Sequence, residues 1–95
     1  MSNQEGSLLR LWGKEVKNNR ILREFTAEVC SDDTRTHKIF QCISEICHEL
    51  DLAEPIWLEG NIAEFKRMAR TRFRRDSFME DIDFDYLEIR VLEEN

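Results

Sequence analysis

Glycine and proline are scarce in this sequence, which has three glycines and one proline in 95 residues. The glycines at positions 6, 13 and 60 stand isolated, whereas a loop that cradles phosphate groups needs several glycines close together. The sequence also contains no internal repeat and no low-complexity segment. These absences exclude the common nucleotide-binding motifs, and we expect no bound cofactor.

Long apolar runs are also missing, since no segment approaches the roughly 20 apolar residues that cross a bilayer. The first residues lack the basic region and the following apolar region of a secretory signal. Cys30, Cys42 and Cys47 are odd in number and follow no disulfide framework. We therefore expect reduced thiols in a cytoplasmic protein that does not associate with membranes.

The composition is that of a small globular protein, with 41% apolar and 36% charged residues. A chain of this length builds one modest core, which predicts one domain. Its apolar residues are too frequent and too regularly spaced for a disordered chain. The first residues are polar and unpatterned, so residues 1–7 are predicted to form a flexible tail and residues 8–95 a single domain.

Residues 8–30 show the pattern of a β-hairpin around Asn18 and Asn19. Asparagine tolerates the positive φ that a two-residue turn requires, and β-prone runs flank the pair. If these two residues are the loop, Lys17 faces Arg20. Three apolar pairs then share one face, namely Val16 with Ile21, Trp12 with Phe25, and Leu8 with Val29.

The opposite face of this predicted hairpin carries Leu9, Leu11 and Leu22. Gly13 marks a candidate bulge that would change which face points into the core. The sequence leaves both arrangements open. If these leucines stay outside the core, they are available to a protein partner or to self-association.

Residues 31–52 give the clearest helical pattern. Apolar residues recur every three or four positions, at Ile39, Ile43, Ile46 and Leu50. The segment 31–33 offers an N-cap, and Pro55 ends any continuation. Residues 55–58 then form an extended segment that packs Trp57 on the core.

Residues 59–70 predict a second, shorter helix, in which Asn61 and Glu64 match a capping box. The main C-terminal strand is expected at Tyr86–Leu92, after a loop or bulge near Asp85. Another short strand is possible at 71–74 or at 77–79.

Together these segments predict an α+β fold: a small antiparallel sheet, made of the N-terminal hairpin and the C-terminal strand, packed against two helices. The order is β-β-α-α-β. On the sheet, the expected core residues are Trp12, Phe25 and Ile89 or their neighbours. On the helical side they are Ile39, Ile43, Ile46, Leu50, Trp57 and Phe65.

A basic segment lies within this acidic chain. Residues 61–75 carry six cations and one anion, whereas the whole chain has a formal charge of −6. Residues 31–60 carry two cations and seven anions, and residues 76–95 carry one cation and eight anions. The candidate residues for binding an anion or a partner are Lys66, Arg67, Arg70, Arg72, Phe73, Arg74 and Arg75.

Three interpretations of the basic segment stay open. In the favoured one, its arginines pair with the acidic residues that follow, at Asp81, Asp83, Asp85 and Glu88. In the second, they bind a protein or a small anion. In the third, they bind RNA or another polyanion, because guanidinium groups pair with phosphate and Phe65 or Phe73 could stack on a base. The acidic surroundings disfavour the third interpretation.

The residue spacings in this sequence do not match known calcium or zinc sites. Asp81, Asp83 and Asp85 resemble the start of a calcium loop, but Tyr86 and Leu92 occupy the positions that need glycine and glutamate. Zinc would require closely spaced pairs of ligands, and the sequence has no C-x-x-C or H-x-x-x-H. We expect no metal site.

Nucleophilic catalysis has a weak basis in this sequence. Cys30 and His37 flank the start of the first predicted helix, yet no spacing requires them to meet. We therefore predict a non-catalytic binding or interaction module. An RNA- or polyanion-binding protein is the alternative, and an enzyme based on Cys30 or His37 is a weaker one.

Several short segments resemble a known family. They are LWGK at 11–14, KNNRI at 17–21, DTRTHKIF at 33–40, PIWL at 55–58, NIAEFKR at 61–67, TRF at 71–73 and IDFDYLEI at 82–89. Together they are similar to short proteins from anaerobic Gram-positive bacteria, a family with no assigned activity. The resemblance covers about residues 8–92. It implies a stand-alone bacterial domain and no particular site residues.

Overall fold

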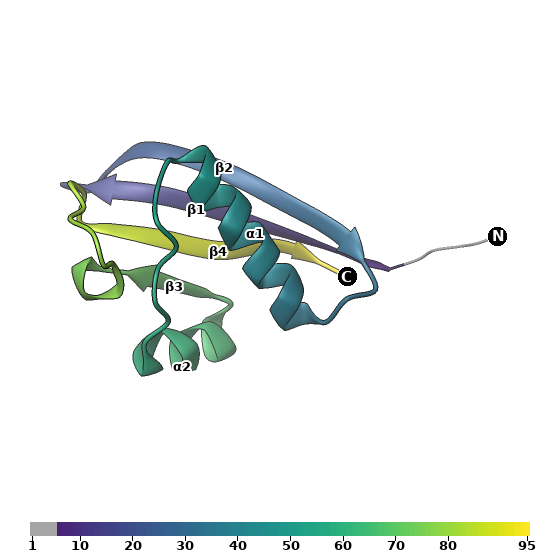
Figure 1. The fold of residues 1–95 in the computed structure, drawn as a ribbon. Helices are drawn as coiled ribbons and strands as arrows, with labels where there is room; N and C mark the ends of the chain where they lie inside the picture. The colour runs from purple at the N-terminus through teal and green to yellow at the C-terminus, as the bar shows by residue number, and fades with distance from the viewer. Residues whose placement is uncertain (1–5) are drawn as a thin grey trace.

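The computed structural model describes residues 6–95, which form a four-stranded antiparallel sheet and two helices (Figure 1). The strand order is β2-β1-β4-β3. The strands are β1 at Ser7–Lys17, β2 at Arg20–Ser31, β3 at Arg70–Phe73 and β4 at Tyr86–Glu94. Helix α1 spans Arg35–Glu49, helix α2 spans Glu59–Met68, and a short 3-10 helix, η1, spans Arg75–Ser77. The predicted α+β class and its β-β-α-α-β order are confirmed.

Strand β3 is the additional short strand for which the sequence allowed two locations, 71–74 or 77–79. It spans Arg70–Phe73 and pairs antiparallel with β4, whereas residues 77–79 form no strand. At the other end of the chain, β1 begins at Ser7, one residue before the predicted domain boundary. The rest of the predicted tail falls largely on residues 1–5, which lie outside the described residues.

The hairpin turn forms where it was predicted, but its register changes beyond the turn. Asn18 and Asn19 have φ values of 53° and 64°, as the two-residue turn requires. Val16 pairs with Ile21 as expected. The next pair joins Glu15 to Arg23, so the extra residue of a bulge lies in β2 between residues 21 and 23 and not at position 13 of β1.

This bulge reverses the predicted faces of β2 beyond the turn, because a one-residue slip moves every following side chain to the other side of the sheet. Phe25, Ala27 and Val29 therefore lie on the same face as Leu9 and Leu11 of β1, and this face is the buried one. Leu9 and Leu11 are buried, with exposures of 1% and 0%. They belong to the core and are not available for the self-association that their predicted exposure allowed. Trp12 pairs with Thr26 and lies on the opposite face, so its predicted place in the core is wrong.

Helix α1 supplies the other half of the core and lies across one face of the sheet (Figure 1). Its predicted apolar stripe is buried as expected: Ile39, Ile43, Ile46 and Leu50, together with Cys42 and Cys47. The partly buried Trp57 and the buried Phe65 pack against the same cluster. Within residues 6–95, neither helix is long and apolar enough to cross a membrane.

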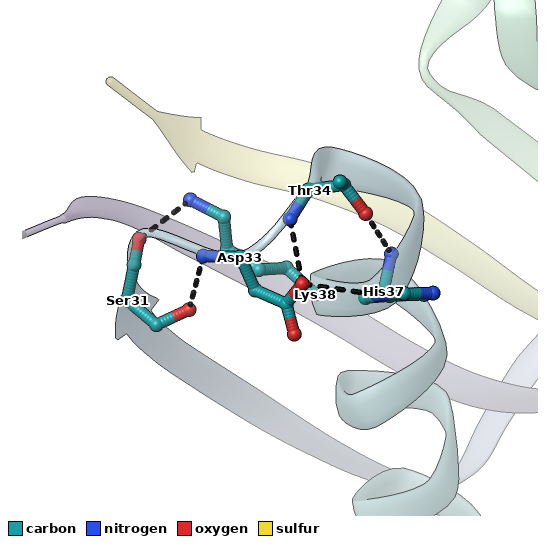
Figure 2. A network of polar contacts seen from close by, with 5 residues as sticks. All are labelled: Ser31, Asp33, Thr34, His37 and Lys38. Carbon is teal, nitrogen blue, oxygen red and sulfur yellow. Dashed lines mark hydrogen bonds and ion pairs between the residues drawn. The ribbon is translucent and has the colours of Figure 1, made fainter.

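The N-cap of α1 is Thr34, one residue beyond the predicted capping segment at 31–33 (Figure 2). Its Oγ1 accepts a hydrogen bond from the backbone N–H of His37 at 3.2 Å. Asp33 supports this cap, because its Oδ1 accepts from the Thr34 N–H at 2.8 Å and lies 3.0 Å from His37 Nδ1. These bonds lower the pKa of the Asp33 carboxyl, chiefly through the His37 ring.

Lys38 joins this helix start to the ends of the two hairpin strands. Its side chain is buried, with 6% exposure. The Nζ donates to the Ser7 backbone oxygen at 2.9 Å, to Ser7 Oγ at 2.6 Å and to the Ser31 backbone oxygen at 3.2 Å. The contact with Ser31 is drawn in Figure 2. Three oxygen acceptors thus replace the water that the ammonium group loses on burial.

The two faces of the sheet have different surroundings. Helix α1 packs on β1 and β2, and α2 packs beside β3 (Figure 1). No helix in the described part of the chain covers the opposite face, which we call the open face. This asymmetry decides where polar side chains of the sheet meet solvent.

Candidate functional site

The basic segment divides into two groups because helix α2 ends within it. Ala69 adopts a left-handed conformation, with φ 57° and ψ 30°, and terminates the helix. Lys66 and Arg67 therefore lie on α2, whereas Arg70 and Arg72 lie on β3. The predicted helix 59–70 is two residues too long.

Strand β3 separates its side chains by alternation. Thr71 and Phe73 point into the domain, with exposures of 1% and 0%. Arg70 and Arg72 point to the open face, and the extended Arg74 continues the row. Because Phe73 is fully buried, its predicted stacking on a base is wrong.

Strand β4 brings a further arginine to this row. Arg90 lies directly opposite Arg70 in the register of β3 and β4. Beside this pair, Glu88 is opposite Arg72 and accepts from its Nε at 3.0 Å. Glu88 Oε2 is also 3.9 Å from Arg90. We call the set Arg70, Arg72, Arg74 and Arg90 the arginine face.

Two of these guanidinium groups contact the ring of Tyr86. The Arg72 guanidinium carbon lies 4.5 Å from the Tyr86 ring centroid, and that of Arg74 lies 5.4 Å away. Contacts of this kind stabilise a cation by about 0.5–1 kcal/mol at exposed sites. They hold both side chains over the same ring on the open face.

A hollow of about 250 Å³ lies beside β3, lined by Glu64, Arg70, Thr71, Arg72, Arg74 and Glu88. Its two carboxylates already have donors within the protein. Glu64 accepts from Thr71 Oγ1 at 2.8 Å, and Glu88 accepts from Arg72. Arg70 and Arg74 have no carboxylate within 4.0 Å among residues 6–95. The hollow therefore has spare cationic donors.

Asn61 stabilises the wall of this hollow. The sequence pattern placed it at the helix N-cap, but the N-cap is Leu58, whose N–H donates to Asn61 Oδ1 at 3.1 Å. The Nδ2 of Asn61 donates to Thr71 Oγ1 at 3.0 Å and to the Arg72 backbone oxygen at 2.9 Å. Asn61 and Glu64 thus both join helix α2 to strand β3.

The predicted internal pairing of the arginines is correct only in part. Arg72 pairs with Glu88, and Arg75 approaches Asp81 at 3.3 Å. The second pair is 75% and 96% exposed, so solvent screens it strongly. Asp85 does not meet an arginine, and its Oδ2 accepts from the Asn18 N–H at 2.9 Å.

Arg67, Arg70 and Arg74 are the arginines for which the pairing prediction is wrong. Within the described chain none of them has a carboxylate partner within 4.0 Å, and Arg67 donates only to Met68 Sδ at 3.8 Å. Asp83 likewise forms no ion pair there. The acidic segment at 80–85 therefore does not neutralise the row of arginines on β3.

The wider open face also carries residues that the sequence reasoning missed. Lys14 Nζ lies 4.4 Å from the Trp12 ring centroid, and Trp12 Nε1 donates to Glu24 at 2.7 Å. Trp12 and Arg90 are paired across β1 and β4. The alternation of Tyr86, Glu88 and Arg90 could have placed Arg90 here, but the neighbours of Trp12 depend on the bulge in β2.

The charge of the open face has the opposite sign to that of the chain. By strand register and ion pairs, it holds six cations and four anions. The cations are Arg10, Lys14, Arg70, Arg72, Arg74 and Arg90, and the anions are Glu24, Glu28, Glu88 and Glu93. These side chains sum to +2, and Glu64 of α2, which lines the hollow beside them, lowers the sum to +1, whereas the whole chain is −6. An approaching anion meets a locally cationic surface.

The cysteines and histidines are not arranged as a catalytic group. Burial raises the pKa of Cys42 to about 11 and that of Cys47 to about 12, which keeps both thiols protonated at neutral pH. Cys30 is exposed, and its Sγ contacts the Gly6 backbone oxygen at 4.0 Å. His37 contacts Asp33 instead. Across residues 6–95, no three His, Cys, Asp or Glu side chains are grouped to hold a metal ion.

Thiol accessibility predicts a clear difference in labelling. At neutral pH, Cys30 should react with a thiol-selective reagent at least about 100-fold faster than Cys42 or Cys47, because the latter two are buried and protonated. Mass spectrometry of peptides from the folded protein would measure the three rates. In denaturant the rates should become equal, and rapid labelling of Cys47 in the folded state would contradict its burial in the core.

Comparison with protein-family profiles, with curated proteins and with solved structures finds no match to this chain. The resemblance to the bacterial family therefore stays a prediction. The functional interpretation depends on the geometry of the chain itself.

Proposed function

We propose that this protein is a non-catalytic binding module that holds a phosphate-bearing partner on the arginine face. The main support for this proposal is that Arg70 of β3 and Arg90 of β4 lie directly opposite each other in the sheet. Like charges directly opposite in a sheet destabilise it, by up to about 1 kcal/mol. An anionic ligand would remove this repulsion, and Arg70 has no internal carboxylate partner in residues 6–95.

Phosphate is the anion best matched to this surface. Guanidinium forks donate two parallel hydrogen bonds to phosphate oxygens. Arg70, Arg72 and Arg74 occupy alternate positions of an extended segment, roughly 6.7 Å apart. A row with this repeat favours a ligand with several phosphates over a single ion.

A single-stranded nucleic acid is the specific polyanion that a second observation favours. Trp12 and Tyr86 lie on the same open face as the arginines, and aromatic side chains stack on unpaired bases. The net positive charge of this face reduces the repulsion expected from the acidic composition. We place the protein in the cytoplasm, in agreement with its three free cysteines.

The test is binding of a labelled, mixed-sequence single-stranded RNA, measured by fluorescence anisotropy at about 50 and about 200 mM salt. If four arginines each neutralise one phosphate, affinity should fall about 50-fold between these concentrations. The double variant Arg70→Gln/Arg74→Gln removes two such contacts. Its affinity should fall only about sevenfold over the same range.

The matched control is Lys17→Gln/Arg20→Gln, which removes two exposed cations at the hairpin end. It should bind nearly as well as the wild type. Inorganic polyphosphate of the same charge serves as a second ligand without bases. Equal affinity for both ligands would restrict recognition to phosphate, whereas tighter RNA binding would implicate Trp12 and Tyr86. Absence of binding at the lower salt concentration, or equal losses in both variants, would refute the proposal.

A further inference from the structure

A second hollow lies between the two helices, away from the arginine face. It has a volume of about 330 Å³, within the range of small-molecule sites. We call it the interhelix groove. Its lining residues are Arg35, Thr36, Ile39 and Phe40 from α1, Trp57 from the connecting segment, and Ile62, Phe65 and Lys66 from α2.

The aromatic floor of the interhelix groove is held in place by edge-to-face contacts. The Trp57 ring centroid lies 5.4 Å from that of Phe65 and 5.0 Å from that of Phe73, with interplanar angles of 86° and 85°. Phe40 makes a third such contact at 6.3 Å. Because Phe65 and Phe73 are buried, the floor is preformed and a ligand need not order it.

The groove walls expose apolar surface that nothing in the described chain covers. Phe40 is 49% exposed and Ile62 is 42% exposed, although both are large apolar residues. Water in such a hollow finds few hydrogen-bonding partners, so an apolar group of a ligand would displace it favourably. The groove therefore suits the apolar body of a ligand.

The charged residues of the groove are all cations in an acidic chain. Arg35 lies 5.5 Å from the Phe65 ring centroid and donates to Glu94 at 2.6 Å, so part of its charge is compensated. Lys66 forms no ion pair within 4.0 Å in residues 6–95. No carboxylate lines the groove. A cation without a partner beside an apolar hollow complements an anionic head group on an apolar chain.

We propose that the interhelix groove binds small amphiphilic carboxylates. The apolar chain lies on Trp57 between α1 and α2, and the carboxylate accepts hydrogen bonds from Lys66 and from Arg35. This site is independent of the arginine face, because none of its lining residues belongs to that face. Failure of either proposal therefore leaves the other standing.

The probes are octanoate, decanoate and decyltrimethylammonium, each used below its micelle concentration with the full chain. Titrations followed by two-dimensional NMR should shift the backbone amides around Phe40, Ile62 and Lys66. Decanoate should bind about three- to tenfold more tightly than octanoate, since each methylene adds buried apolar area. The cationic amphiphile should bind at least about tenfold more weakly than decanoate.

Two variants separate the groove from general hydrophobic association. Lys66→Gln should weaken decanoate binding about fivefold or more, whereas Lys17→Gln, which removes one exposed cation far from the groove, should not. Ile62→Asp should abolish binding without unfolding the protein, because Ile62 is outside the buried core and 42% exposed. Thermal melting of each variant confirms that it is folded.

Several results would overturn the proposal. Equal binding of the cationic amphiphile, or equal losses in the two lysine variants, would leave only nonspecific apolar association. Binding to anionic vesicles without binding to decanoate would identify a membrane-facing surface instead. Concentration-dependent dimerisation that broadens the signals of the same groove residues would show that a second copy of the chain occupies it.

Discussion

Replacing Ile46 with alanine is expected to lower the free energy of unfolding by about 3–4 kcal/mol. Ile46 is fully buried in the C-terminal part of α1, and Gly13 of β1 lies directly beneath it. A Cβ added at position 13 would come within 2.6 Å of Ile46 Cγ2 and 3.1 Å of Ile46 Cδ1. The glycine is required here because the helix approaches the sheet so closely.

The contact between these two positions makes their mutations non-additive. Gly13→Ala alone should cost about 1–3 kcal/mol through overpacking. In the double variant, the new methyl group enters the space that Ile46→Ala vacates. The free energy of unfolding lost in the double variant should therefore be at least about 1 kcal/mol smaller than the sum of the two single losses.

Chemical denaturation of the four proteins in this cycle measures the coupling directly. A matched control is Ile43→Ala with Gly13→Ala, because Ile43 is also buried on α1, whereas the three atoms nearest to a Cβ at position 13 all belong to Ile46. This control pair should be nearly additive. A stable Gly13→Ala protein would mean that α1 sits farther from β1 than described.

Replacing Arg23 with methionine is expected to lower the free energy of unfolding by about 2–3 kcal/mol. Its partner Glu15 is buried, with 2% exposure, and receives two bonds from the guanidinium group at 3.1 and 2.8 Å. The same group donates to the Leu50 backbone oxygen at 2.6 Å, which ties the C-terminus of α1 to the hairpin. Arg23 itself is half exposed, so the loss stays below the roughly 3–5 kcal/mol of a fully buried pair.

The physical cause of this loss is the carboxylate left behind. The double variant Glu15→Leu/Arg23→Met removes both charges, so its stability should return to within about 1 kcal/mol of the wild type. Urea unfolding of the two variants and the wild type tests this expectation. If the double variant were as unstable as Arg23→Met, the buried charge would not be the cause, and the lost bond to α1 would be the explanation.

The parts of the fold that were predicted correctly are formed by contacts between residues that are close in the sequence. Asn18 and Asn19 are next to each other and adopt the positive φ that their turn needs. The apolar stripe of α1 repeats within one helix, so its period alone identifies the buried face. Such patterns are readable because the interacting residues are close in sequence.

The errors arose where the deciding contact joins distant segments. The bulge between residues 21 and 23 places Phe25 and Val29 of β2 on the face of Leu9 and Leu11, and a bulge in β2 leaves no trace in the alternation of β1. Asn61 matched a helix cap, but its side chain also bonds to β3 ten residues later. Local propensity does not contain this information.

In the candidate site, too, the local features were predictable from the sequence and the contacts between distant segments were not. The cluster of cations at 66–75 was evident from composition, but the sequence could not tell which of them would meet a carboxylate. The register of β3 and β4 sets Arg72 against Glu88 and Arg70 against Arg90. It also removes Phe73 from the surface.

By itself, the sequence determined the hairpin turn, the two helices, the α+β class and the presence of a basic segment, because each is encoded by residues within a few positions of one another. The tertiary structure alone decided which face of the hairpin is buried, and it divided the cations between the arginine face and the interhelix groove. Strand register and helix docking depend on packing between segments far apart in the chain, and a single-residue shift in that packing exchanges the inside of a sheet for its outside.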